Sequence, residues 1–335
     1  MTAFQTTRRT LLQLIGSLPV FRAVQGRATS SFTLVPAFVP GQVMRYRLES
    51  NVVRNGALGH RSRSTVTLEI VDRRADGWLA RWTSSDGELV DADPRMRPML
   101  AAVQGLWDGV AIDLLLDAGG RVEGLADPAA VRALGETCLD RLAAVLAADP
   151  QRAPMAAPLR AALAPTLDDG GMLSQSLIKE PAILLGAMGH DYRIGEPLEV
   201  RTRIASPLGS GEIPVLGRYQ VRGIASRELR ADIGWLMVID RATAARTLGA
   251  EIAELVRGAG AATTAVAGNP QAPISDAEVS DLLATLDFDD RADFIVDTSN
   301  AWPVRVSHVR RVSAGAGSRV DSVELTRLAG RAENA

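Results

Sequence analysis

Apolar and polar residues alternate along most of the chain from residue 43 onward. In residues 44–52, apolar side chains dominate the even-numbered positions, and charged or polar side chains fill the odd-numbered ones. A period of two is typical of a β-strand with one buried face. Residues 66–70 and 78–82 repeat the pattern, and Asp76-Gly77 provides a tight turn before the third segment. The three segments predict an antiparallel meander.

The same alternation marks further segments, most of them separated by turn residues such as Asp117–Gly120 and Ser299-Asn300. They lie at residues 110–116, 121–125, 198–204, 215–221, 233–239, 292–297, 304–312 and 319–328. Almost all of these strands can be joined by hairpins. The chain therefore offers about eleven strands for one antiparallel sheet.

Helical spacing of apolar residues interrupts the strands. Asp127 provides an N-cap with proline at the next position, and apolar residues recur at helical spacing up to Pro150. Cys138 falls on this apolar stripe, so we expect a packed and unreactive thiol. Further helices are predicted at residues 156–163 and 241–257. Another begins at the capping box Ser275-x-x-Glu278.

Helices that follow each group of strands can cover the apolar face of a sheet. We therefore predict an α+β fold. Its main element is a large curved antiparallel sheet of about eleven strands, an open half-barrel, with helices covering the concave face.

Two parts of the chain echo one another. Phe38-x-x-Gly41 before the first meander matches Tyr192-x-x-Gly195 before the second, and residues 70–79 match residues 224–236 once three residues are inserted. We interpret residues 29–335 as a single α+β domain with an internal duplication, about 36–150 and 190–330. A flap rich in Pro, Ala and Met, about 151–189, joins the two copies.

Residues 1–28 have the layout of a cleavable export signal. Paired arginines precede a short, modestly apolar run, and small residues end the segment at Gly26 and Ala28. The sequence Thr7-Arg8-Arg9-Thr10-Leu11-Leu12 resembles the bacterial twin-arginine motif, which implies passage through the twin-arginine translocase. An amphipathic N-terminal helix packed on the domain is the alternative. We expect a periplasmic protein that is soluble after cleavage.

The strand count, the placement of the helices and the export signal together resemble the LolA-type periplasmic lipoprotein carriers and related periplasmic lipid-binding proteins. This is a resemblance of fold. It implies that the protein binds an acyl chain or another apolar ligand between the sheet and the helices.

The charge and the composition of the chain limit the classes of partner that it is expected to bind. Apolar residues make up 47% of the chain, which supports a large core, and the net charge is −2. Removal of residues 1–28 leaves 33 basic and 39 acidic side chains, a net charge of −6. This balance disfavours nucleic acid as a partner. No apolar run reaches the length of a membrane span, so no stable membrane anchor is expected.

We expect large apolar side chains to line the ligand cavity. Five of the eight methionines fall in the poorly patterned residues 95–190, and methionine adapts to varied apolar ligands. The candidates are Tyr46, Leu68, Trp82, Trp107, Met155, Met172, Tyr219 and Trp235. The alternative is that the loop methionines form an ordinary core beneath a long loop.

No residue is assigned to catalysis, to a metal or to a cofactor. The histidines at 60, 190 and 308 have no metal-ligand spacing, although His308 is predicted to point inward. The acidic group Asp287, Asp289, Asp290 and Asp293 lacks the glycine of a calcium loop, and Gly209-x-Gly211 lacks the context of a phosphate loop. Two alternatives stay open: an exported hydrolase whose site forms only in three dimensions, and an envelope assembly factor without a ligand.

Overall fold

The structure is a computed structural model. It describes residues 31–94, 96–148, 150, 153–167, 172–205, 212–225, 227–239, 285, 287–314 and 317–329. The strands are β1 (Ser31–Thr33), β2 (Val43–Arg54), β3 (Ala57–Arg73), β4 (Gly77–Ala92), β5 (Ala111–Asp117), β6 (Val122–Leu125), β7 (Asp191–Arg193), β8 (Leu198–Ala205), β9 (Glu212–Ala225), β10 (Arg230–Ile239), β11 (Asp287–Asp297), β12 (Pro303–Ala314) and β13 (Gly317–Arg327). The helices are α2 (Arg97–Trp107), α3 (Pro128–Ala147), α4 (Ala153–Leu163) and α5 (Met172–Leu185), with a 3-10 turn at Ala164–Leu167.

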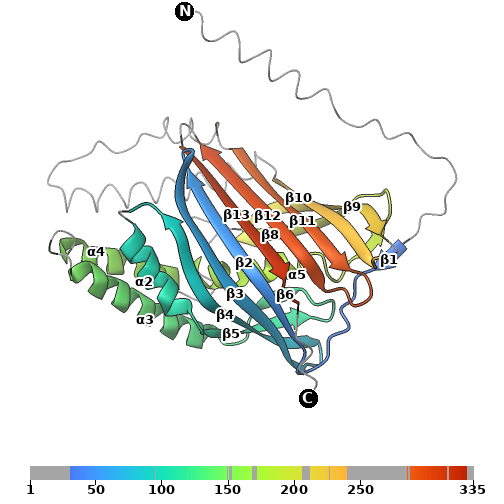
Figure 1. Cartoon of the computed structure of the whole chain (residues 1–335), viewed down its shortest axis with the longest axis horizontal. Coiled ribbons are helices and arrows are strands. Elements are labelled where there is room, and N and C mark those ends of the chain that lie inside the picture. The colour runs from blue at the N-terminus through green and yellow to red at the C-terminus, as the bar shows by residue number, and fades with distance from the viewer. Residues whose placement is uncertain are drawn as a thin grey trace, which may run out of the picture. The chain divides into compact units, whose positions relative to one another are not determined.

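One antiparallel sheet of eleven strands dominates the fold. Its order is β6-β5-β4-β3-β2-β13-β12-β11-β10-β9-β8, so the last strand of the chain pairs with β2 in the middle of the sheet (Figure 1). Every connection along the sheet except the β2–β13 pairing joins strands that are consecutive in the chain. The predicted α+β class with one large, unclosed antiparallel sheet is confirmed.

A second, two-stranded sheet pairs β1 with β7. Phe32 and Tyr192 are opposite one another in this pair, and their rings stack with centroids 5.5 Å apart. The segment before β2 is thereby tied to the segment that follows α5.

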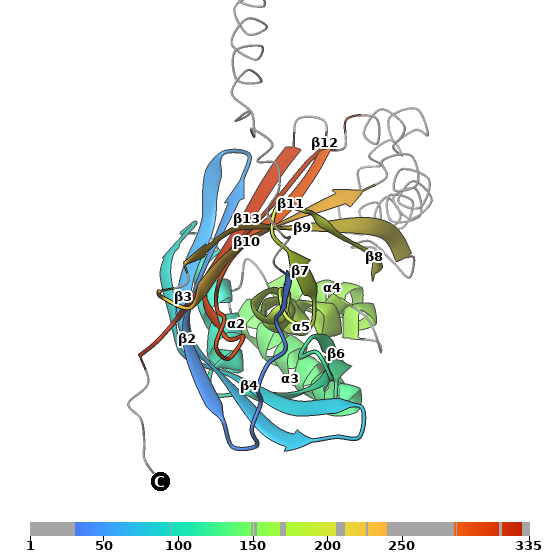
Figure 2. The same ribbon diagram turned by 90° about the vertical axis from the view of Figure 1, so that its right-hand side faces the viewer.

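The helices lie on one side of the curved sheet (Figure 2). Helix α3 begins as predicted, because the Asp127 side chain accepts a hydrogen bond from the backbone N–H of Ala130 at 2.9 Å. Helices α2 and α5 were not predicted from the sequence, and the helix expected at 156–163 begins three residues earlier. Local signals in α2 and α5 are weak: α2 has no side-chain cap, and α5 contains Pro181. Packing against the sheet and the other helices stabilises such segments.

The predicted alternation places the core correctly. On β3, Val66, Leu68 and Ile70 are fully buried and face the helices, as do Leu114 and Leu116 on β5. On β3, the polar residues Thr67 and Glu69 occupy the positions between the buried ones. These apolar rows bury much of the surface that drives folding.

The two segments that echo one another share a glycine with positive φ. Gly41 has φ of +81° and Gly195 has φ of +84°, a region that favours glycine, and each lies shortly before the first strand of a meander. Phe38 and Tyr192, three residues before each glycine, are both buried. The internal duplication stays a prediction that these features support.

Several predictions lie outside the described residues. They concern the export signal at 1–28, the helix at 241–257, the helix after Ser275, and the Gly209-x-Gly211 segment.

Candidate functional site: a groove between helix α2 and the sheet

A groove runs between α2 and the inward face of β3 and β4. It consists of two sections that adjoin at Ser84 and Trp107, with volumes of about 130 Å³ and 240 Å³. We call it the α2 groove, with an inner and an outer section. Helix α2 lies against β4 and α3, which holds this wall of the groove in place.

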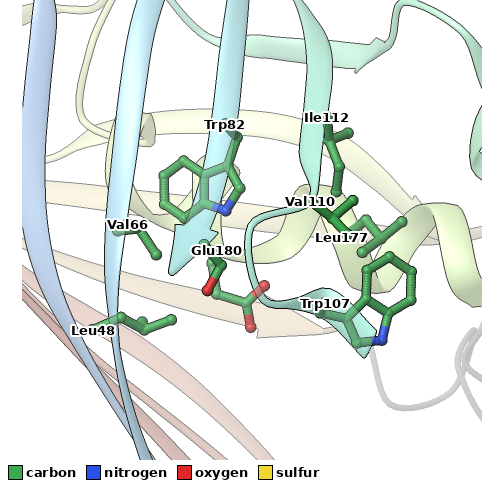
Figure 3. A pocket seen from close by; sticks show the side chains of 9 residues that line it. Leu48, Val66, Trp82, Trp107, Val110, Ile112, Leu177 and Glu180 are labelled. Carbon is green, nitrogen blue, oxygen red and sulfur yellow. The ribbon is translucent and has the colours of Figure 1, made fainter. Parts of the chain in front are cut away.

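The inner section is predominantly apolar. Its strand residues are inward-facing members of neighbouring strands, such as Trp82 of β4 and Ile112 of β5, which lie opposite one another in the sheet. Helix α5 closes the section from the other side with Leu177 and Glu180 (Figure 3). The lining residues are Leu48, Val66, Trp82, Ser84, Trp107, Val110, Ile112, Leu177 and Glu180.

The outer section is more polar. The inward row of β3 continues from Val66 through Ser64 and Ser62 to His60, so its side chains change from hydrocarbon to hydroxyl and imidazole. The lining residues are His60, Ser62, Ser64, Ser84, Gly87, Leu89, Leu100, Val103, Gln104, Trp107 and Asp108. The groove is therefore predominantly apolar at one end and more polar at the other, a gradient that suits an amphiphile.

Glu180 is the one ionisable residue among those that line the inner section. Its side chain points into the space between Trp82 and Trp107 (Figure 3). Burial raises the pKa of the Glu180 carboxyl, and the charges of Lys179 and His308 oppose that shift only in part. Among the described residues, no other residue donates a hydrogen bond to this carboxyl.

His60 lies in the outer section within a basic environment. Burial lowers its pKa, and the charges of Arg319 and Arg54 lower it further. Both arginines belong to the paired strands β13 and β2, where they are opposite one another. The imidazole therefore lies near two basic side chains, and the carboxylate of Asp321 opposes their effect on its pKa in part.

A second polar cluster lies deeper in the sheet, outside the groove. His308 Nε2 is 2.5 Å from Asp290 Oδ1, and Arg310 donates to Asp290 Oδ2 from Nε at 2.7 Å. Although burial opposes ionisation, the hydrogen bond from His308 and the charge of Arg310 hold the pKa of Asp290 below its usual range. The second ring nitrogen of His308, Nδ1, is buried and has no hydrogen-bond partner among the residues that the structure describes.

The exported-hydrolase alternative requires two titratable groups that converge in a cleft. His308 and Asp290 converge, but their side chains are 2% and 0% exposed, and neither lines the α2 groove. We therefore interpret this cluster as a structural tie between β11 and β12.

Aromatic rings connect that cluster to His190. The His190 and Tyr219 rings lie 4.8 Å apart, Tyr219 and Trp235 lie 6.3 Å apart, and Trp235 and His308 lie 6.4 Å apart. Burial lowers the pKa of His190 to about 4 and raises that of Tyr219 to about 12. Tyr219 donates a hydrogen bond to the carbonyl of Gly186 at 3.0 Å.

The predicted lining residues separate into three places. Trp82 and Trp107 line the groove. Tyr46 and Leu68 are 0% exposed in the packed core, where the Tyr46 hydroxyl donates to the Pro303 carbonyl at 3.1 Å. Tyr219 and Trp235 belong to the aromatic row. The side chains of Met155 and Met172 lie outside the described part of the chain.

Sequence reasoning missed Glu180, although a signal was present. Leu173, Leu177, Glu180 and Leu184 are spaced at i, i+4, i+7 and i+11, so Glu180 occupies a position of the apolar stripe of α5. A carboxyl group at such a position indicates an acid that is at least partly buried, and Glu180 is half-buried.

The remaining polar groups take structural roles. Asp290 points inward, whereas Asp293 forms an ion pair with Arg222 at 2.5 Å, so the acidic group of β11 divides between environments and does not form a calcium loop. Within the described residues, no three His, Cys, Asp or Glu side chains are grouped to hold a metal ion. Burial raises the pKa of the Cys138 thiol, which disfavours its reactive thiolate form.

No protein-family model matches the chain, and no curated protein matches it. Among solved structures, one titled "Lipid-protein interactions in lipovitellin" aligns with a TM-score of 0.38 and 10% sequence identity, covering 89% of this chain and 26% of that one. The chain thus spans about a quarter of the length of that protein. Within the described residues, no helix has both the length and the apolar composition needed to cross a bilayer.

Proposed function

We propose that the protein binds or carries an apolar or amphiphilic ligand, without catalysis, in the α2 groove. The observation that carries this proposal is the change along one groove from a predominantly apolar inner section to a more polar outer section. The hydrocarbon part of the ligand occupies the inner section, and its polar part faces His60, Ser62 and Ser64. The twin-arginine-like pattern of residues 1–28 supports the further proposal that the protein works in the periplasm after export.

The dimensions of the groove suit a short chain or ring. An apolar cavity of about 150 Å³, lined by aliphatic and aromatic side chains, is known to bind benzene. The inner section has a similar volume. Each buried methylene contributes about 0.8 kcal/mol, so an eight-carbon chain gains on the order of 6 kcal/mol. The costs of association reduce this gain. We therefore expect modest affinity for a simple hydrocarbon, with further binding energy from polar contacts.

The test begins with the protein as its host produces it. Native mass spectrometry of the full chain purified from its own host should show a co-purifying amphiphile, and extraction should release it. Cell fractionation should place the protein in the periplasm. A clean mass without ligand, combined with no binding of octanoyl compounds to the purified protein, would favour the ligand-free assembly factor.

A blocking substitution locates the site. Ser62→Trp places a large side chain in the outer section, and Thr67→Trp places the same side chain on the opposite face of β3. The first variant should lose binding of the co-purifying amphiphile, whereas the second should retain it. Equal binding by both variants would remove the groove as the site.

A further inference from the structure

Glu180 is an unusual residue for a site that holds only hydrocarbon, and this inference rests on the proposed function. Its carboxyl points into the inner section of the groove (Figure 3). An ionisable side chain in apolar surroundings costs free energy unless it is neutral or paired.

The surroundings of Glu180 contain few charges. The residues that β2, β3, β4, β5 and α2 contribute to the inner section are aliphatic or aromatic, apart from the hydroxyl of Ser84. The charges that act on the carboxyl come from Lys179, its neighbour on α5, and from His308 of β12. Neither makes an ion pair with Glu180 within the described residues. Burial is the largest influence on the carboxyl and raises its pKa, so the neutral acid persists to higher pH than it does for an exposed glutamate.

We propose that Glu180 is a specificity-determining residue whose carboxylic acid O–H donates a hydrogen bond to an oxygen acceptor on the ligand, such as an ester or ketone carbonyl. A neutral carboxylic acid has one O–H donor, and the inner section presents no described acceptor that already uses it. The ligand is therefore an apolar molecule with a carbonyl oxygen that enters the inner section, rather than a plain hydrocarbon.

Two other ligand chemistries are less favoured. An alkylamine would pair with ionised Glu180 and could contact the faces of Trp82 and Trp107, but the pair would have to form in apolar surroundings, where desolvation opposes it. An alkyl carboxylate would bring a second negative charge beside the acid. Both are outcomes that binding measurements can detect.

The experiment compares octane, methyl octanoate, octylamine and octanoate as ligands of the full chain. Wild-type protein should bind methyl octanoate about 5-fold more tightly than octane, the contribution of one hydrogen bond. Glu180→Leu should bind both equally, whereas Glu180→Gln should keep the preference because its amide still donates. Glu136→Gln, an exposed glutamate on α3, is the matched control and should behave as wild type.

The pH dependence of the preference for methyl octanoate distinguishes hydrogen bonding by Glu180 from a role of its side chain in packing alone. As the pH rises through the raised pKa of Glu180, the wild type should lose its preference for methyl octanoate, because the carboxylate cannot donate. Glu180→Gln should keep the preference at every pH. Thermal unfolding of each variant establishes that it is folded.

The outcomes also distinguish the inference from the proposed function. If none of the four compounds binds to the wild type, the proposed function fails, and the inference fails with it. If the compounds bind but the ester preference survives in Glu180→Leu, or octylamine binds most tightly, the role of Glu180 is overturned and the groove stays a binding site.

Discussion

His308 Nε2 lies 2.5 Å from Asp290 Oδ1 in the interior of the sheet. The two residues are diagonal neighbours on adjacent strands, because Asp290 is directly opposite Arg310 and His308 is directly opposite Ala292. Arg310 satisfies the other oxygen of the same carboxylate, with Nη2 at 2.6 Å. One buried carboxylate therefore holds two side chains of β12 against β11.

Replacing this carboxylate should destabilise the fold strongly. Asp290→Asn removes the negative charge but leaves the buried His308 and the half-buried Arg310, and breaking such a pair costs about 3 kcal/mol. Asp113→Asn removes the partner of Arg81 in a more exposed ion pair and should cost less than about 1 kcal/mol. Denaturant unfolding measures both. Similar losses in the two variants would contradict the role of the buried cluster.

His190 should make the protein sensitive to mild acid. Its folded pKa of about 4 lies below the ordinary value of 6.5, so the unfolded chain takes up a proton first as the pH falls. Stability is therefore full above pH 6.5 and declines down to about pH 4, by about 3 kcal/mol in total. In His190→Gln this part of the decline should be absent. Denaturant unfolding at pH 7 and at acid pH measures it, and parallel curves for the two proteins would refute the assignment.

Glu180 should contribute to stability at low pH and lose that contribution as the pH rises, whereas the contribution of His190 is lost as the pH falls. Because its folded pKa is raised, its proton binds more tightly in the folded chain than in the unfolded chain. The stabilisation is complete below the ordinary carboxyl pKa and is lost as the pH rises through the folded value. The free energies of unfolding of the wild type and of Glu180→Gln should differ least at acid pH. As the pH rises, the variant should become more stable relative to the wild type. A constant difference between the two unfolding free energies would argue that the carboxyl is solvated.

Gly77 should not tolerate a side chain. It begins β4 next to β5, and a Cβ atom there would collide with the carbonyl oxygen of Leu116. Since that oxygen belongs to the backbone of a paired strand, the collision can be relieved only by moving the strand. Gly77→Ala should lower the free energy of unfolding by about 3 kcal/mol.

Gly124 on β6 provides the matched control. A Cβ atom there would meet nothing within 4 Å, so Gly124→Ala should change the free energy of unfolding by less than about 0.5 kcal/mol. Thermal or denaturant unfolding of the two variants measures the contrast. Equal stability would show that β4 and β5 can separate without cost.

The strands and their inward faces were predictable from the sequence alone. Alternation at Val66, Leu68 and Ile70 predicts a buried face, and these residues are buried, because a period of two is a property of the extended backbone itself. The N-cap at Asp127 was predictable for the same reason, since its hydrogen bond spans only three residues. Local chemistry thus determined the fold class and the location of most strands of the large sheet in the described part of the chain.

The groove was decided by tertiary structure. Leu48 and Glu180 line the same section although 132 positions separate them, and no local pattern relates them. Helices α2 and α5, which form two of its walls, carry weak local signals and are stabilised by what they pack against. The tie between Asp290 and His308 likewise depends on the register of two strands. The period of the sequence pattern predicts which face of a strand is buried. Only the pairing and packing of distant segments decide which side chains line the same cavity and which carboxyl group is desolvated.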